Sequence, residues 1–122
     1  MLAGSDFGGM WLVAGFSLHQ EFDLLARAGF TPLKVLQMTT LDGAQLLGRE
    51  GQAGSVEEGK DANLVVLDAN PLESVQNLHK VYGVVRGGNY YSKDALDNLK
   101  QKVRKHMESA QAASMPAEKA TP

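Results

Sequence analysis

Gly54-Ser-Val-Glu-Glu-Gly-Lys-Asp-Ala-Asn-Leu-Val-Val-Leu-Asp68, followed at once by Ala-Asn-Pro-Leu72, is the most informative stretch of the sequence. Its first half is charged and contains Gly59, a composition typical of a turn. Leu64 to Leu67 is an apolar run with two β-branched valines, which predicts a short strand buried on both faces. Asn70-Pro71 ends the strand, because proline has no N–H to donate to a sheet.

The residues before this stretch, 17–48, carry a helical pattern in three parts. Apolar residues recur at intervals of three and four from Leu18 to Ala26, with Ser17 as a candidate N-cap and Gln20 as its capping-box partner. Gly29 ends this helix, and Thr31-Pro32 begins a second one. Thr39-Thr40 separates the second helix from a third, which begins at Leu41 and has Gly48 as its C-cap.

The residues after the strand predict a connection, a hairpin and a helix. Residues 71–79 are expected to form a polar connection, and 81–91 two strands around a turn at Gly87-Gly88. From Ser92, a candidate N-cap, a helix is expected to reach Met107 with Leu96, Leu99, Val103 and Met107 on one stripe. Residues 109–122, rich in Ala, Ser and Pro, are expected to form a disordered tail.

Composition narrows the classes of protein. The chain has 122 residues, 43% of them hydrophobic and 21% charged, and a net charge of −2, which is ordinary for a soluble globular protein and gives no reason to expect a nucleic-acid partner. Because it has no cysteine, a metal would have to be held by His, Asp, Glu or a modified Lys. Residues 10–16 are too short to span a bilayer, so no membrane partner is expected and the expected location is cytoplasmic.

Two stretches carry a resemblance to a known family. Residues 54–68 resemble the G-x-I-x-x-G-x-x-A-D-L-V-V-L-D return strand of the amidohydrolase superfamily, and residues 17–48 are similar to its h-x-E-L-x-x-L-v-x-A-G-l-T-P signature and the helices that follow. They occur in the family's order. The pattern is nearest to the imidazolonepropionase and Xaa-Pro dipeptidase-like branch.

The resemblance implies an α/β fold class: the C-terminal fragment of a (β/α)8 metal-dependent hydrolase barrel, strands of its small composite β-sandwich, and a C-terminal helix. A complete barrel takes about 250 residues, twice the length of this chain. Residues 1–48 would contain the end of barrel strand 8 and the helices after it, 49–92 the β-sandwich strands, 93–108 the C-terminal helix, and 109–122 the tail.

The same resemblance suggests two site residues. Asp6, in Gly4-Ser5-Asp6, resembles the acid at the end of the eighth barrel strand, which contacts the catalytic metal and accepts the proton of the hydrolytic water; Asp6 could instead cap a turn. His19 is a candidate for substrate binding, with a local hydrogen bond near the helix N-terminus as the alternative. His79 and His106 are isolated in the sequence and are expected to be structural or solvated, and no H-x-H metal-ligand pair occurs.

Two functions remain open at this stage. The first is the C-terminal part of an amidohydrolase acting on a C–N bond in an amide, cyclic amide or peptide-like substrate. Such an enzyme would use a divalent metal, which the resemblance implies is zinc. This chain alone is not expected to bind it. The second is a small non-catalytic α+β remnant or interaction module. A fragment of a barrel would leave unpaired strand edges, so it is expected to form a homo-oligomer or to bind a complementary chain.

Overall fold

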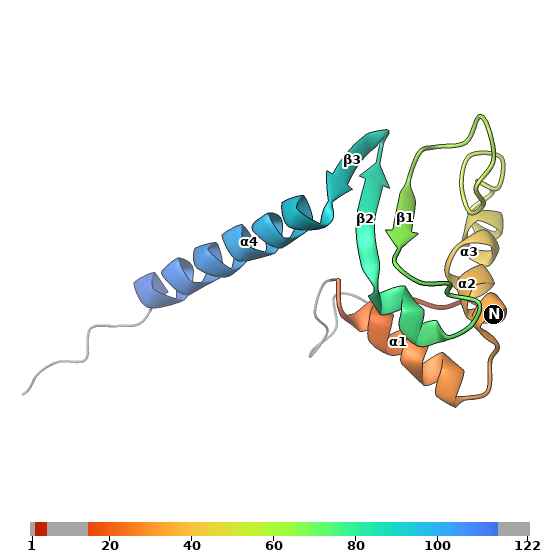
Figure 1. The fold of residues 1–122 in the computed structure, drawn as a ribbon, viewed down its shortest axis with the longest axis horizontal. Helices are drawn as coiled ribbons and strands as arrows, with labels where there is room; N and C mark the ends of the chain where they lie inside the picture. Colours follow the sequence, from red (N-terminus) through yellow and green to blue (C-terminus); the bar gives the residue numbers. More distant parts are fainter. Residues whose placement is uncertain (1, 5–14, 115–122) are drawn as a thin grey trace, which may run out of the picture.

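A computed structural model describes residues 2–4 and 15–114 as a small α/β structure with an antiparallel sheet and a long C-terminal helix (Figure 1). Helices α2 and α3 lie beside β1, α1 lies below the sheet in this view, and α4 projects from the β3 side. The described elements are α1 (Ser17–Arg27), α2 (Pro32–Thr39), α3 (Leu41–Leu46), β1 (Leu64–Leu67), the 3-10 helix η1 (Val75–His79), β2 (Val81–Arg86), β3 (Asn89–Ser92) and α4 (Lys93–Ser114).

Local sequence chemistry sets the helix ends. The Thr31 hydroxyl accepts a hydrogen bond from the Lys34 N–H at 3.3 Å, and Pro32 occupies the first turn, as predicted. Gly29 adopts φ +93° directly after α1, a conformation that favours glycine. The predicted capping box is wrong: α1 begins at Ser17 itself, and Phe16 occupies the N-cap position without a side-chain cap.

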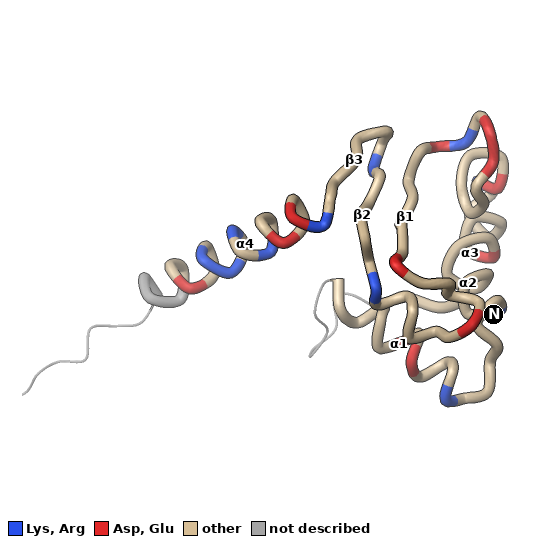
Figure 2. The backbone as a smooth tube through the Cα atoms, viewed as in Figure 1, with Lys and Arg blue, Asp and Glu red and all other residues tan. Residues whose placement is uncertain are grey.

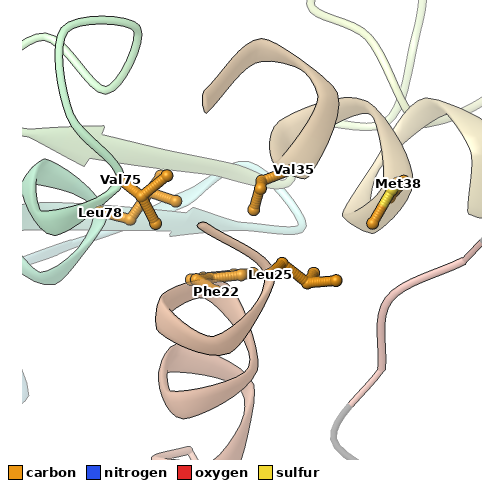
Figure 3. Close-up of a cluster of buried hydrophobic side chains, with 6 residues drawn as sticks. All are labelled: Phe22, Leu25, Val35, Met38, Val75 and Leu78. Atoms are coloured by element: carbon orange, nitrogen blue, oxygen red, sulfur yellow. The ribbon is translucent and has the colours of Figure 1, made fainter. Parts of the chain in front are cut away.

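The hydrophobic core joins the helices to a segment far along the chain (Figure 3). Phe22 and Leu25 of α1 pack with two fully buried side chains of α2, Val35 and Met38. The cluster is completed by two residues of η1, Val75 and Leu78. The structure thus corrects the prediction that residues 71–79 are a polar connection: residues three apart lie on one side of a 3-10 helix, so Val75 and Leu78 both reach the core.

The sheet has the order β1-β2-β3 with both pairs antiparallel, and the hairpin turn lies at Gly87-Gly88 as predicted. β1 lies at one edge, and its pairing with β2 is irregular between Val66 and Leu67. The prediction that β1 is buried on both faces is wrong, since Val65 is 59% and Val66 41% exposed. Among the described residues, no second sheet packs over this strand and only Leu67 of β1 joins the core cluster.

Helix α4 begins where the sequence predicts, with the Ser92 hydroxyl accepting a hydrogen bond from the Ala95 N–H at 3.3 Å. It continues to Ser114, past Met107 and into the predicted tail, because alanine has a high helix propensity. It packs mainly against β2 and β3, and Lys93 in its first turn also lies 3.9 Å from Asp68. None of the described helices, the 22-residue α4 included, is long and apolar enough to cross a bilayer.

The described N-terminal residues 2–4 lie beside α2. The Ala3 N–H donates to the Met38 carbonyl oxygen at 3.3 Å, and Ala3 packs against the core. Residues 2–4 are not part of a strand, and the described strands form one open three-stranded sheet. Asp6 lies outside the described residues.

Candidate functional site

A cleft of about 760 Å³ opens between the helices and the β1 side of the sheet. Its walls are largely apolar and come from α1, α2, α3, the segment 47–56, β1 and the start of β2. Three of its apolar residues are strongly exposed: Leu47 at 73%, Val56 at 83% and Val65 at 59%. Arg49 and Asp61 also line the cleft and form an ion pair at 3.4 Å. Its size is that of a typical ligand pocket.

His19 lies at the α1 side of this cleft and is part of a polar cluster that also holds Asp23, Gln76 and His79. His19 and Asp23 are four residues apart in α1, which places them on one face of the helix. Asp23 Oδ1 accepts a hydrogen bond from Gln76 Nε2 at 2.8 Å and lies 3.0 Å from His79 Nε2. One carboxylate therefore joins α1 to two side chains of η1, those of Gln76 and His79.

The two imidazole rings are neighbours. The His19 and His79 ring centroids are 4.9 Å apart, and on its other side His19 meets Phe22 edge-on at 5.5 Å. His19 Nδ1 is buried and has no hydrogen-bond partner among the described residues. Burial of the ring, and secondly the nearby His79, lower the pKa of His19 below its ordinary 6.5, while the Asp23 carboxylate acts in the opposite direction. The His19 ring is therefore neutral at neutral pH.

The described residues do not form a metal centre. Within residues 2–4 and 15–114, no group of three or more His, Cys, Asp or Glu side chains is arranged to hold a metal ion. The reason is visible in the cluster: His79 Nε2 is directed at Asp23, and the same Asp23 oxygen already accepts from Gln76. A divalent metal therefore does not fit the described residues alone.

Of the two site residues predicted from the sequence, only His19 lies in the described part of the chain. Asp6, the candidate catalytic and metal-binding residue, lies outside the described part of the chain. His19 is placed at the cleft, but its buried Nδ1 faces away from solvent. His106 lies on exposed α4, outside this cluster.

Sequence reasoning missed Asp23 and Gln76 and treated His79 as isolated. The spacing of His19 and Asp23 by one helical turn was the only local sign that the two side chains share a face. Gln76 and His79 lie 53 and 56 positions after Asp23 in the chain. No local signal pairs them with Asp23, because the contact depends on η1 packing against α1.

Comparison with known proteins identifies the family. Residues 1–90 match the amidohydrolase family, and the chain belongs to it. It is 43% identical over 54 residues to a 5'-deoxyadenosine deaminase of Methanobrevibacter smithii, which covers 44% of this chain and 12% of the deaminase. It is 47% identical over 38 residues to an S-triazine hydrolase of Gordonia rubripertincta, covering 31% of this chain and 8% of that enzyme.

A solved structure is also similar to this chain. A Xaa-Pro dipeptidase with methionine bound in its active site superposes with a TM-score of 0.58 at 33% identity, over 62% of this chain and 18% of the dipeptidase. The chain thus spans about an eighth or less of the two curated relatives and under a fifth of the dipeptidase. The aligned part corresponds to part of an amidohydrolase structure.

Proposed function

We propose that this chain is the C-terminal part of a metal-dependent amidohydrolase that hydrolyses a C–N bond and that is inactive without an N-terminal barrel portion. The observation that carries the proposal is the family match over residues 1–90, combined with the small share of each relative that the chain covers. A deaminase and a dipeptidase, among the relatives, are named for reactions at a carbon–nitrogen bond. The proposed substrate is a small amide, cyclic amide or peptide-like molecule.

Asp6 is the proposed catalytic residue. Its carboxylate would be one ligand of a divalent metal, zinc in this proposal, and would accept the proton of the attacking water. Catalytic zinc sites usually have three protein ligands, so a single carboxylate does not make a site. The other ligands would come from the N-terminal portion, since the described residues form no such group.

His19 is the proposed substrate-contacting residue. Its place at the wall of the cleft supports this role, and its lowered pKa makes it a neutral hydrogen-bonding group rather than a cation. Because Nδ1 is buried, the contact would be made through the other ring nitrogen.

Fragment complementation tests the proposal. The chain is mixed with the N-terminal portion of the Xaa-Pro dipeptidase, cut where the matched region begins, and zinc content and hydrolysis of a Xaa-Pro dipeptide are measured. We expect neither bound zinc nor hydrolysis from the chain alone, and both from the mixture. Asp6→Asn should lower hydrolysis by the mixture about 100-fold or more, the scale of a lost general base.

Asp94→Asn is the matched control, because it removes the same charge from an exposed site in the first turn of α4. Hydrolysis that is equal for Asp6→Asn and Asp94→Asn would contradict the role of Asp6. Stoichiometric zinc on the chain alone would contradict the need for an N-terminal portion.

The second candidate function is a non-catalytic α+β module. The buried cluster of α1, α2 and η1 favours it, because this core is built entirely from the chain's own residues. A mixture that forms a stable complex, binds zinc and yet hydrolyses no amine, triazine or dipeptide substrate would favour the module over the enzyme.

A further inference from the structure

Helix α4 presents an apolar stripe that nothing in the described chain covers. Leu99, Val103 and Met107 are 47%, 62% and 62% exposed and lie four residues apart, so they form one line along the helix. Leu96, one turn earlier, is half-buried where α4 meets the sheet. An exposed line of large apolar side chains is typical of a docking surface.

Cations border this stripe. The segment 98–107 contains Lys100, Lys102, Arg104 and Lys105 and no acidic residue. By helical spacing, Lys100 and Arg104 flank the stripe on one side and Lys102 on the other. Two α4 helices packed face to face would bring these cations together, so electrostatics disfavour self-pairing of α4. The stripe suits an apolar groove with an acidic border.

The cleft of the same protein is a largely apolar groove next to a segment of net negative charge. Leu47, Val56 and Val65 expose apolar surface along it, and the segment 49–61, part of which lines the cleft, has four acidic and two basic residues. Asp61 pairs with Arg49 and Glu57 with Lys60, so the segment's net charge of −2 comes from Glu50 and Glu58. Figure 2 shows Lys and Arg along the middle of α4 with Asp and Glu nearer its two ends, and more Asp and Glu than Lys and Arg on the connection between α3 and β1. The two surfaces are complementary in both hydrophobicity and charge.

A chain cannot join these two surfaces within itself. The order β1-β2-β3 puts β3 at the edge of the sheet opposite β1, and α4 starts directly after β3. From there α4 runs away from the body, while the cleft lies on the β1 side (Figure 1). The cleft that receives a given α4 must therefore belong to another molecule.

We infer that α4 of one copy docks by its Leu99–Val103–Met107 stripe into the cleft of a second copy. This assembly needs neither the metal nor the reaction proposed above, and the docked helix would exclude a substrate from the wall of the cleft at His19. Exchange in both directions would give a closed dimer with two identical contacts, in the manner of domain swapping. The charged border predicts that the dimer weakens as salt is raised.

Molar mass in solution, measured by size-exclusion chromatography with light scattering, tests this assembly on the complete chain. At about 100 μM chain, a concentration that detects even weak complexes, we expect a dimer that shifts toward monomer between about 0.05 M and 0.5 M NaCl. Leu99→Asp with Val103→Asp should raise the dissociation constant about 30-fold or more, the scale of lost interface anchors. A wild-type chain that is monomeric throughout overturns the inference.

Matched variants separate docking from unfolding. Asn98→Asp with Gln101→Asp adds the same two charges to the opposite face of α4 and should leave the dimer intact. Leu47→Asp with Val56→Asp alters the exposed cleft border and should give a monomer. Circular dichroism should show native helix content in all three. A dimer that survives the cleft substitutions overturns the inference, because α4 would then dock elsewhere.

Mixing the two monomeric variants gives the sharpest result. The cleft of the α4 variant and the α4 of the cleft variant are both intact, so one contact can form and the mixture should yield a one-to-one complex. If α4 instead paired with α4, the cleft variant would already be a dimer by itself and the α4 variant would not join it, which would overturn the inference. Because no step measures hydrolysis, an inactive enzyme and a failed assembly are distinguished.

Discussion

Asp23 Oδ1 lies 3.0 Å from His79 Nε2 and joins helix α1 to a 3-10 helix 56 residues further along the chain. The same oxygen accepts from Gln76 Nε2, so both bonds depend on one half-buried carboxylate. Asp23 thus connects α1 to η1 through polar contacts, beside the core in which Phe22 of α1 and Val75 of η1 are packed.

Replacing Asp23 with Ala should destabilise the protein by about 1 kcal/mol, because two hydrogen bonds are lost but water can still reach the partly exposed partners. The urea midpoint of unfolding measures this. Asp97→Ala is the control, since its ion pair with Lys100 at 3.0 Å is exposed and local to α4. An Asp23→Ala midpoint no lower than that of the control would show that the link contributes nothing.

Stability should fall as the solution is acidified, in part because of His19. Its pKa is lower in the folded chain than its ordinary 6.5, so the unfolded chain binds more protons as pH falls below that value. The contribution of His19 is therefore complete above pH 6.5 and is lost as pH falls through the folded pKa. His19→Asn should flatten the pH dependence of the free energy of unfolding measured by urea titration between pH 5 and pH 8. The matched control is His106→Asn, the same substitution at an exposed position of α4.

Met38→Ala should cost about 3 kcal/mol, because Met38 is only 1% exposed and its removal leaves a cavity among α1, α2 and η1. Leu33→Ala in the same helix is the matched control: Leu33 is 53% exposed, and we expect less than about 1 kcal/mol. Thermal and urea unfolding both report the difference. Similar costs at the two positions would mean that the core is not where the buried cluster places it.

Gly54→Ala and Gly59→Ala separate backbone strain from steric contact. Both glycines have positive φ, +93° and +86°, so either substitution costs about 1 kcal/mol of conformational energy. At Gly54 an added Cβ would also lie 2.7 Å from the Ala44 Cβ, while at Gly59 it meets nothing within 4 Å. Gly54→Ala should therefore be the more destabilising by about 1 kcal/mol or more, and Ala44→Gly should recover part of that difference in urea unfolding.

The sequence predicts most of the fold where local chemistry determines it. Thr31-Pro32 and Ser92 mark helix starts, Gly29 a helix end and Gly87-Gly88 the hairpin turn, and each acts through its own backbone or a neighbour within three residues. The family resemblance of residues 17–72, confirmed by the match over residues 1–90, supplied the fold class in part.

The wrong predictions concern residues whose burial depends on contacts between segments that are far apart in the sequence. Val75 and Leu78 look like part of a polar connection until η1 packs against α1, and β1 reads as fully buried although no second sheet covers Val65 and Val66 among the described residues. The contact between His19 and His79 belongs to the same class, since 60 residues separate the two rings and no local pattern brings them together.

The position of η1 late in the sequence has a consequence for synthesis on the ribosome. Chains emerge from the N-terminus and fold as their segments become available. Helices α1 and α2 emerge before η1, so their apolar faces lack Val75 and Leu78 until residue 78 has left the exit tunnel. The nascent chain must therefore expose the apolar faces of α1 and α2 while the 39 residues from Thr40 to Leu78 emerge, a period in which chaperones or a second nascent chain can bind these faces first.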